Sequence, residues 1–490
     1  LRAGAAANEH PPVLRTHDRY GHRIDEVEFH PAWHRLMDIA VSHGVHALPW
    51  RDHRSGAHVA RAGMMILGGG VESGHGCPIS MTYAAIPALR MEPDLAREWE
   101  PRLTSLTYDP RLAPPQEKAG ALAGMAMTEK QGGSDVRANT TRAEPLSDGG
   151  YALTGHKWFC SAPMCDAFLV LAQAPEGLTC FLLPRVLPDG TRNAFHIQRL
   201  KDKLGNRSNA SSEVEFHGAW VRRVGEEGRG VQTIIEMVNH TRLDCVLGST
   251  GLIRRAVAEA THHAAHRSAF GKRLLDQPLM QNVLADLCVE SEASTALAMR
   301  LARAVDEGGS DERATLFKRL AVAVGKYHVC KTGVGVVAEA LECLGGNGYV
   351  EESGMPRLYR ETPLNSIWEG SGNVNALDVL RAVSKQPDTL AAFIDEVDQA
   401  RGADRRLDGF VDDLKRDVSD LDQIEVRARR LVEHLAMALQ GSLLVRHAPR
   451  EVADAFVVSR LGGDGGRAYG TLPAGIDYSA IIDRHRPALG

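Results

Sequence analysis

Residues 363–381 read PLNSIWEGSGNVNALDVLR, and the rest of the chain can be ordered around this stretch. Glu369 stands between Trp368 and a Gly-Ser-Gly turn, and apolar residues at helical spacing follow at once. Glycines at 370 and 372 let a ligand approach the backbone closely, and a helix that begins at residues 371–373 points free N–H groups at an anionic partner. The alternative is an ordinary helix start, where an acidic side chain only favours the helix dipole.

The composition limits the kinds of protein that this chain can be. With 490 residues, 43% of them hydrophobic, the chain can bury several cores, and roughly three or four domains are expected. Its net charge of −5 gives no reason to expect nucleic acid or an anionic membrane as the main partner. The eight cysteines form no Cys-x-x-Cys pair, which favours reduced thiols in a cytoplasmic protein over disulfides or a zinc site.

Several other features argue against a membrane protein, a secreted protein and a metal site. No apolar run approaches the roughly 18 residues that a membrane span needs. The opening LRAGAAANEH lacks a methionine and the charged-then-apolar order of a secretory signal, which predicts a trimmed start. Six histidines between positions 30 and 58 have no acidic partner at ligand spacing, so they are interpreted as surface and packing side chains, and no metal is predicted.

Four sections with different patterns follow one another along the chain. Interrupted helical periodicity comes first, and it includes Gly68-Gly69-Gly70 as a breaker or close-packing site. Short β-type runs between Gly-rich turns then predict a sandwich or barrel, and long helical runs after them predict a four-helix bundle. The fold class is therefore a multidomain α+β protein, with predicted domains at 1–122, 123–228, 229–384 and 385–490.

The last of these sections is predicted to be helical up to Arg450 and weakly ordered in the Gly-rich sequence beyond it. Its 15 Lys and Arg against 18 Asp and Glu give a net charge of −3. Arg427, Arg429 and Arg430 form a local basic cluster behind an Asp-rich stretch. A solvated helix face is favoured over a nucleic-acid patch at this cluster.

Five motifs in this order carry a resemblance to a known family: MTEKQGGSD (127–135), GHKWFCS (155–161), RSAFGKRLLDQPLMQ (267–281), ECLGGNGY (342–349) and IWEGSGN (367–373). Together with the helical, β and bundle order, they resemble the acyl-CoA dehydrogenase family from about residue 60 to 383. The details and the extra C-terminal section look most like its AidB branch, flavoproteins linked to the alkylation response. The resemblance implies the family fold, FAD as cofactor and a homotetramer.

The resemblance also implies a chemistry for the opening stretch. Glu369 stands at the family's catalytic-base position, where it would take the α-proton of an acyl-CoA while a flavin accepts the β-hydride. Burial beside Trp368 and flavin is expected to raise the pKa of this carboxyl toward a range useful for a base. Some relatives carry the base just before an arginine of the first long bundle helix. Here that place is Thr241, which leaves Glu369 as the candidate, and Arg242 would orient or charge-balance it.

A first group of cofactor residues is expected in the β section. The resemblance assigns flavin contacts to Met127, Thr128, Ser134, Phe159 and Ser161. Hydroxyl groups suit the ring's nitrogen and oxygen edge, and an aromatic side chain can stack on the ring system. This chain departs from the family where phenylalanine 159 replaces the usual tryptophan, serine 161 the usual threonine, and residues 130–131 a Pro-containing stretch.

A second group is expected to hold the adenine and pyrophosphate of FAD, partly across a subunit interface. The resemblance places Arg267, Phe270, Gln281, Gly345 and Gly346 there, with Asn373 contacting the same nucleotide from the other side. An arginine supplies several donors to phosphate, and glycines allow close backbone approach. A site shared in this way predicts an obligate homo-oligomer.

The functional prediction is an FAD-dependent dehydrogenase of short or branched acyl-CoA that passes electrons to a flavoprotein or to oxygen. The alternative is a DNA-binding, protective flavoprotein of the alkylation response with weak dehydrogenase activity, which would use the C-terminal section as its DNA face. Salt-dependent duplex binding through the arginines at 427–430 distinguishes that alternative. A third hypothesis, an oxidase, depends on access of oxygen to the flavin.

Overall fold

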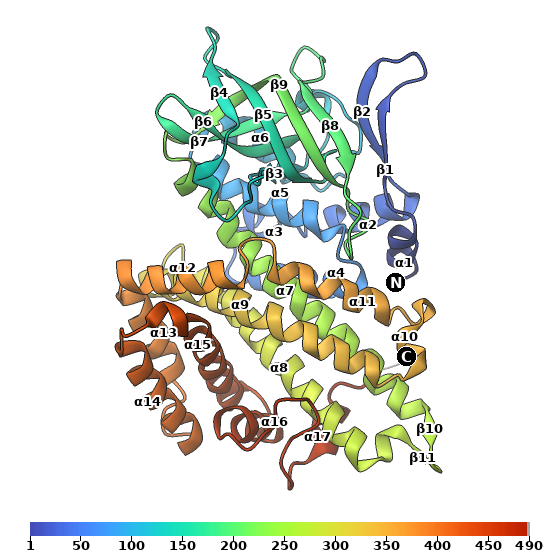
Figure 1. Ribbon diagram of the computed structural model, residues 1–490, viewed down its shortest axis with the longest axis vertical. Helices are drawn as coiled ribbons and strands as arrows, with labels where there is room; N and C mark the ends of the chain where they lie inside the picture. The colour runs from blue at the N-terminus through green and yellow to red at the C-terminus, as the bar shows by residue number, and fades with distance from the viewer. Residues whose placement is uncertain (488–490) are drawn as a thin grey trace. The chain divides into compact units, whose positions relative to one another are not determined.

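The computed structural model describes residues 1–487 and divides them into two compact units (Figure 1). The first unit holds residues 1–57 and 71–241, and the second holds residues 58–70 and those from 242 onward. Besides its strands, the first unit contains α1 (Arg2–Glu9), α2 (Pro31–Ser42), α3 (Leu48–Arg51), α5 (Gly76–Leu89) and α6 (Pro93–Leu103).

The β section of the first unit closes into a barrel. Five strands pair in a ring, β6 with β4, β4 with β5, β5 with β9, β9 with β7, and β7 back to β6. Strand β3 adds to β6 in parallel and β8 adds to β9. The strands are β3 (Ala123–Ala126), β4 (Arg142–Pro145), β5 (Tyr151–Ser161), β6 (Ala167–Ala174), β7 (Gly177–Pro184), β8 (Phe195–Leu200) and β9 (Ser211–Val224). Of the two predicted β architectures, the barrel is confirmed.

An N-terminal hairpin was not predicted. Strands β1 (Val13–His17) and β2 (Arg23–Glu28) pair antiparallel within a section that was interpreted as mainly helical. Asp18 accepts main-chain hydrogen bonds from Tyr20 at 2.8 Å and His22 at 2.9 Å, and Gly21 has a φ of +88°. This Asp-x-x-Gly turn is a local signal of a hairpin, and it outweighs the weak helical periodicity around it.

The second unit is built on long helices that run side by side (Figure 1). These are α7 (Gly230–His266), whose first turns belong to the first unit, α8 (Pro278–Glu307), α9 (Glu312–Glu342) and α12 (Gly372–Lys385). The four predicted helical runs are thereby confirmed. The short elements β10 (Ser268–Ala269), β11 (Lys272–Arg273), α10 (Gly346–Tyr349) and α11 (Met355–Glu361) connect them.

Helix α4 (Ala57–Val71) runs through the three glycines at 68–70 without a break, and its residues 58–70 belong to the bundle. A Cβ at Gly69 would lie 3.3 Å from the Gly248 Cα, and one at Gly251 would lie 2.3 Å from the Ile66 oxygen. Glycines on both helices therefore allow α4 and α7 to approach closely. The close-packing interpretation of the glycines is confirmed, and the breaker interpretation is wrong.

The extra C-terminal section contributes α13 (Asp388–Asp398), α14 (Arg405–Ser419), α15 (Ile424–His447), α16 (Arg450–Phe456) and α17 (Tyr478–Asp483). It packs against α8 and α9, and Arg460 forms buried ion pairs with Asp286 and, at 2.9 Å, Glu290. Helical structure continues past Arg450 to Leu461, so the predicted end of the helical part is wrong. Val452, Phe456 and other buried apolar side chains explain the continuation, because they complete the packing on α15.

Residues 1–487 carry neither a membrane-spanning helix nor a clustered metal-binding group. No helix in this part of the chain has the length and apolar character that crossing a membrane requires. The same residues contain no group of three or more His, Cys, Asp or Glu side chains arranged to hold a metal ion.

Candidate active site

The turn from Trp368 to Ser371 carries the predicted base and has an unusual backbone. Glu369 has a φ of +55° and Gly370 a φ of +95°. The left-handed conformation costs a residue with a side chain about 1–2 kcal/mol, so it persists only where the surroundings fix it. Helix α12 begins directly afterwards at Gly372, with Ser371 as its N-cap, and this confirms the predicted helix start.

Buried cations from two helices hold the carbonyl oxygens of this turn. Lys326 on α9 donates from Nζ to the Trp368 oxygen at 2.8 Å and also to the Gly370 oxygen. Arg242 on α7 donates from Nε to the Glu369 oxygen between them at 3.0 Å. Lys326 is 1% exposed and Arg242 is 6% exposed. These contacts explain how the left-handed turn is fixed.

Amide side chains complete the hold on the same segment. Asn375, in the first turn of α12, donates from Nδ2 to the oxygens of Gly370 at 2.6 Å and Ser371 at 3.0 Å. The Trp368 indole donates to Asn365 Oδ1 at 3.0 Å, so the ring next to the base is held as well. Four successive main-chain carbonyls, from residue 368 to residue 371, therefore accept hydrogen bonds from side chains.

The charges of Arg242 and Lys326 are balanced differently. Arg242 donates from Nη1 to Asp378 Oδ2 at 2.8 Å, and Arg319 donates from Nη2 to Asp378 Oδ1 at 2.9 Å. Burial opposes the charge on Asp378, but the two arginines hold the pKa of this carboxyl below its usual range. Arg242 thus reaches Glu369 at its main-chain carbonyl. Lys326, in contrast, has two carbonyl oxygens as its hydrogen-bond partners.

The predicted nucleotide residues lie far from this turn within the second unit. Helix α7 continues for 24 residues from Arg242 to His266, which is about 36 Å at the α-helical rise, and Arg267 follows. Helix α9 continues for 16 residues from Lys326 to Glu342, about 24 Å, before Gly345. One group of predicted residues therefore lies at the turn, and a second group lies at the other end of these helices.

This distal group has features that suit a partner molecule. Phe270, in the β10–β11 turn, is 98% exposed and has a φ of +53°. Gln281 lies in the first turn of α8, and the neighbouring Gln277 ties this turn to the hairpin through a 3.1 Å bond to the Ala269 oxygen. At Gly345 and Gly346 a Cβ would meet no atom within 4 Å, so the backbone is open to a ligand such as a phosphate.

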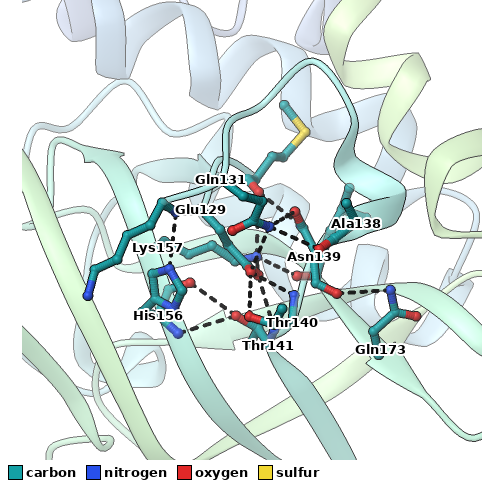
Figure 2. A network of polar contacts seen from close by, with 12 residues as sticks. Glu129, Gln131, Ala138, Asn139, Thr140, Thr141, His156, Lys157 and Gln173 are labelled. Carbon is teal, nitrogen blue, oxygen red and sulfur yellow. Dashed lines mark hydrogen bonds and ion pairs between the residues drawn. The ribbon is translucent and has the colours of Figure 1, made fainter.

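In the first unit, a buried network holds the segment that contains Met127 and Thr128 (Figure 2). Glu129, fully buried, pairs with Lys157 of β5 at 2.8 Å. It also accepts hydrogen bonds from the main-chain N–H of Thr140 at 2.7 Å and Thr141 at 3.1 Å. Burial opposes the charge of Glu129, but Lys157 and these donors hold the pKa of its carboxyl well below the usual range.

The same network reaches the main chain of the predicted flavin residues. Asn139 donates from Nδ2 to the Met127 oxygen at 3.0 Å, and the Trp158 N–H donates to the Thr128 oxygen at 2.8 Å. Figure 2 shows Asn139 and Lys157 on either side of Glu129 in this cluster. The loop after β3 is thus fastened to strand β5, next to Phe159.

The remaining predicted flavin residues are accessible. Phe159 is 48% exposed, and the Lys201 ammonium lies 4.5 Å from its ring centroid. The Ser161 hydroxyl lies 3.2 Å from that of Ser211 at the end of the same β5–β9 pairing. Ser134 is exposed in the turn after Gly133. An exposed aromatic ring beside hydroxyl groups fits the requirements of a flavin ring.

Several residues of these sites were missed in the sequence. Lys326 lies in the buried apolar run LAVAVGKYHVC, and a lysine surrounded by apolar residues on every side of a helix was the available signal. Asn375 and Asp378 occur at polar positions of α12 that turn out to be buried. Glu129 and Lys157 lie inside two of the quoted motifs, but nothing in their spacing shows that they pair.

The C-terminal arginines do not present one common surface. Arg427 donates to the main-chain oxygens of Asp417 and Asp422, so its guanidinium is used within the section. Arg429 donates to the Tyr327 hydroxyl at 3.1 Å, toward α9. Arg430 lies 3.9 Å from the Asp417 carboxylate. The basic cluster seen in the sequence is thus divided among internal contacts.

Comparison with known proteins gives the class of protein first. The acyl-CoA dehydrogenase middle-domain model matches residues 124–219, and the C-terminal-domain model matches residues 228–384. A solved structure of ACDH-11 from Caenorhabditis elegans, in complex with C11-CoA, superposes with a TM-score of 0.88 at 29% identity, over 94% of this chain and 84% of that one. A Bacillus anthracis acyl-CoA dehydrogenase complexed with FAD shares the fold, with a TM-score of 0.68 at 18% identity over 87% and 79% of the two chains.

The branch follows from the N-terminal segment and the full-length relatives. Residues 1–110 match the model of the adaptive response protein AidB N-terminal domain. AidB of Escherichia coli is 48% identical over 468 residues, which are 95% of this chain and 86% of that protein. Acyl-CoA dehydrogenase family member 11 of C. elegans is 32% identical over 94% of this chain and 76% of its own length. The chain belongs to the acyl-CoA dehydrogenase family, in its AidB branch.

Membership of this family confirms the predicted fold class, with a helical segment, a β-barrel, a helical bundle and an extra helical section. The family consists of oxidoreductases that use FAD, and FAD is therefore the cofactor that the site residues have to fit. The exposed Phe159 ring and the open glycines at 345 and 346 fit it. The domain boundaries and the roles of individual residues stay predictions.

Proposed function

We propose that the protein is an FAD-dependent acyl-CoA dehydrogenase in which Glu369 removes the α-proton of the substrate. The observation that carries this proposal is the turn at residues 368–371. A left-handed glutamate held at both neighbouring carbonyls by Lys326 is a costly arrangement that packing alone does not require. Such strain, at the position where the family has its base, supports a catalytic carboxylate.

Each residue of the site has its own role in the proposed reaction. The Glu369 carboxylate accepts the α-proton, and its main-chain N–H donates to the thioester oxygen, where negative charge develops as that proton leaves. Arg242 holds the Glu369 carbonyl, and Trp368 lies beside the base. FAD, when bound, supplies the hydride acceptor. We assign its flavin end to Met127, Thr128, Ser134, Phe159 and Ser161.

The proposed substrate is an acyl-CoA, and its chain length can be identified with a panel of acyl-CoA compounds. Relatives at 27–29% identity over 57–63% of this chain include isovaleryl-CoA and short/branched-chain acyl-CoA dehydrogenases, which supports a short or branched acyl group. The ACDH-11 neighbour binds C11-CoA, which supports a longer one. The panel therefore has to contain butyryl-, isovaleryl-, 2-methylbutyryl- and undecanoyl-CoA.

Anaerobic titration of FAD-replete protein with this panel tests the proposal through bleaching of the flavin absorbance. We expect rapid bleaching by at least one acyl-CoA and its loss in Glu369→Gln, with FAD retained. Glu425→Gln, an exposed glutamate on α15, is the matched control and should bleach like the wild type. Bleaching of Glu369→Gln at the wild-type rate would exclude Glu369 as the base. The rate at which the reduced flavin is reoxidised is then measured with air and with an electron-transfer flavoprotein. The faster reaction identifies the electron acceptor.

We further propose a homo-oligomer, most simply a tetramer, in which one subunit completes the FAD site of another. The separation of about 24–36 Å along α7 and α9 supports this, because Arg267 and Gly345 lie too far from the Glu369 turn to join it within one chain. Gln281 and Gly346 accompany them, while Asn373 stays beside the turn. The variant Phe270→Asp should reduce assembly in sedimentation velocity and release FAD, whereas Leu421→Asp, an exposed site elsewhere, should do neither.

A DNA-associated protective role is the second candidate, and the match of residues 1–110 to the AidB N-terminal model favours it. The arginines at 427–430 give it little support, because two of them are engaged within the unit. Duplex DNA binding measured from 50 to 200 mM salt would detect such a role as a steep loss of affinity. Binding that is independent of salt, or absent, removes this candidate.

A further inference from the structure

We propose that Lys326 is a positioning residue of the active site, which directs the main-chain N–H of Glu369 and strengthens it as a donor to the substrate's thioester oxygen. This inference rests on the proposed function, in which the same N–H is an oxyanion donor. Lys326 was not among the residues that the sequence marks as functional. Its place in the site follows from two hydrogen bonds on either side of the base.

The geometry of the peptide unit between Trp368 and Glu369 determines where the Glu369 N–H points. In a trans peptide, the carbonyl of one residue and the N–H of the next point in opposite directions. Lys326 Nζ binds the Trp368 oxygen at 2.8 Å, so the Glu369 N–H of that same peptide points away from Lys326. The side chain of one buried lysine thereby fixes the direction of the donor that precedes the base.

A second peptide is held in the same way. The bond of Lys326 to the Gly370 oxygen turns the following N–H, that of Ser371, away from Lys326. Between these two peptides, Arg242 holds the Glu369 oxygen and so directs the Gly370 N–H. Three successive N–H groups of the turn are oriented by cations bound to the carbonyls behind them.

The two cations differ in whether a carboxylate pairs with them. The Arg242 guanidinium pairs at 2.8 Å with Asp378, a carboxylate that it shares with Arg319, whereas Lys326 forms no ion pair with a carboxylate among the described residues. Burying an ammonium group without a paired carboxylate is costly, so packing alone does not explain a lysine at this place. A cation on a carbonyl polarises its peptide and makes the N–H a stronger donor. We infer that this polarisation explains why a charged residue occupies the position.

The test compares two ligands on FAD-replete protein. The first is the acyl-CoA that bleaches the wild type fastest, and the second is acetoacetyl-CoA, whose acidic α-carbon lets it bind as an enolate with negative charge on the thioester oxygen. In Lys326→Met we expect flavin bleaching to slow by about 100-fold or more, the loss typical of one oxyanion donor. The Kd for acetoacetyl-CoA should weaken by at least 10-fold, while the Kd for the saturated acyl-CoA and the FAD content stay within threefold.

The matched control replaces Arg460, a largely buried cation of the second unit, with methionine together with Asp286→Asn and Glu290→Gln on α8, so that no carboxylate is left unpaired. It should change neither ligand's Kd. Lys326→Gln keeps a neutral donor and should lie between Lys326→Met and the wild type; it also serves if Lys326→Met does not fold.

Wild-type bleaching rates and acetoacetyl-CoA affinity in both Lys326 variants would overturn the inference. Equal weakening of both ligands would also overturn it, because it would show a merely structural role. These outcomes differ from failure of the proposed function, in which the wild type does not bleach or Glu369→Gln still does. In that case, acetoacetyl-CoA affinity still reports on the N–H donor without turnover.

Discussion

Two fully buried lysines, Lys157 in the first unit and Lys326 in the second, hold the two segments that the sequence marks as functional. Lys157 pairs with the Glu129 carboxylate at 2.8 Å and also binds the Leu171 oxygen at 2.7 Å. Lys326 binds two carbonyl oxygens and no carboxylate among the described residues. The two lysines are thus equally buried, but only Lys157 has a carboxylate partner in the described part of the chain. This difference indicates a different role for each lysine.

A neutralised buried pair fixes structure, because its two charges compensate each other and the surrounding donors satisfy the carboxylate. Around Glu129, donors from Gln131, Thr140 and Thr141 complete such a closed network. Lys326 instead binds two carbonyl oxygens, so its charge acts on the turn that carries Glu369. We therefore expect replacement of Lys157 to cost mainly stability and replacement of Lys326 to cost mainly activity.

The largest expected loss of stability belongs to Lys157→Met. The variant leaves the Glu129 carboxylate fully buried without its cation, which typically costs about 3–5 kcal/mol of unfolding free energy. Urea unfolding followed by tryptophan fluorescence measures the loss. The double variant Glu129→Gln/Lys157→Met is the control and should recover most of it, because no unpaired charge remains. A single variant as stable as the wild type would contradict the comparison.

The second effect is the stability cost of Lys326→Met. Methionine leaves the carbonyls of Trp368 and Gly370 without this donor, which typically costs about 1–3 kcal/mol, but it leaves no unpaired charge behind. The same urea experiment should thus place Lys326→Met between the wild type and Lys157→Met. A loss larger than that of Lys157→Met would reverse the assignment of the two lysines.

The third effect is a loss of stability at acidic pH, which arises from the Glu129 network. The pKa of Glu129 is lower in the folded protein than its ordinary value of 4.5, so its stabilisation is complete above that value and is lost as the pH falls below it. Between pH 6 and pH 3 we expect a loss of more than about 1 kcal/mol from this group. Comparing the wild type with Glu129→Gln/Lys157→Met over that range isolates it, since the double variant should show a shallower slope.

The contrast between the lysines also shows what the sequence could predict. The long helices, the barrel strands and the helix start after Glu369 follow from periodicity, turns and capping, which are local. The contacts of Lys326 with Trp368 and Gly370 join residues 42 and 44 positions apart, and that of Arg242 with Glu369 joins residues 127 apart. Such contacts depend on how helices pack, and no local pattern contains that information.

The left-handed backbone at Glu369 is a second feature that the sequence concealed. Gly370 and Gly372 indicated a turn, yet the residue with a φ of +55° is the glutamate between the tryptophan and the first glycine. Intrinsic preference disfavours this conformation, and the donors on the neighbouring carbonyls override it. Functional sites are the places where such overrides are expected.

The smallest expected effect tests whether the turn is held by contacts or by backbone preference alone. Gly370 and Gly354 both have positive φ, +95° and +74°, but their surroundings differ. A Cβ at Gly370 would lie 3.1 Å from a Val374 methyl and 3.2 Å from Asn375 Nδ2, whereas one at Gly354 would meet nothing within 4 Å. Alanine at 354 should therefore cost only about 1 kcal/mol, the conformational penalty.

Alanine at 370 should add to this penalty the displacement of Asn375, which holds the oxygens of Gly370 and Ser371. We expect Gly370→Ala to lose a few tenths to about 1 kcal/mol more than Gly354→Ala in urea unfolding, and to slow flavin bleaching at least tenfold where Gly354→Ala does not. Equal stability losses and equal bleaching rates would mean that the turn tolerates displacement. The carbonyl contacts at residues 368–371 would then be a consequence of the fold rather than a condition for catalysis.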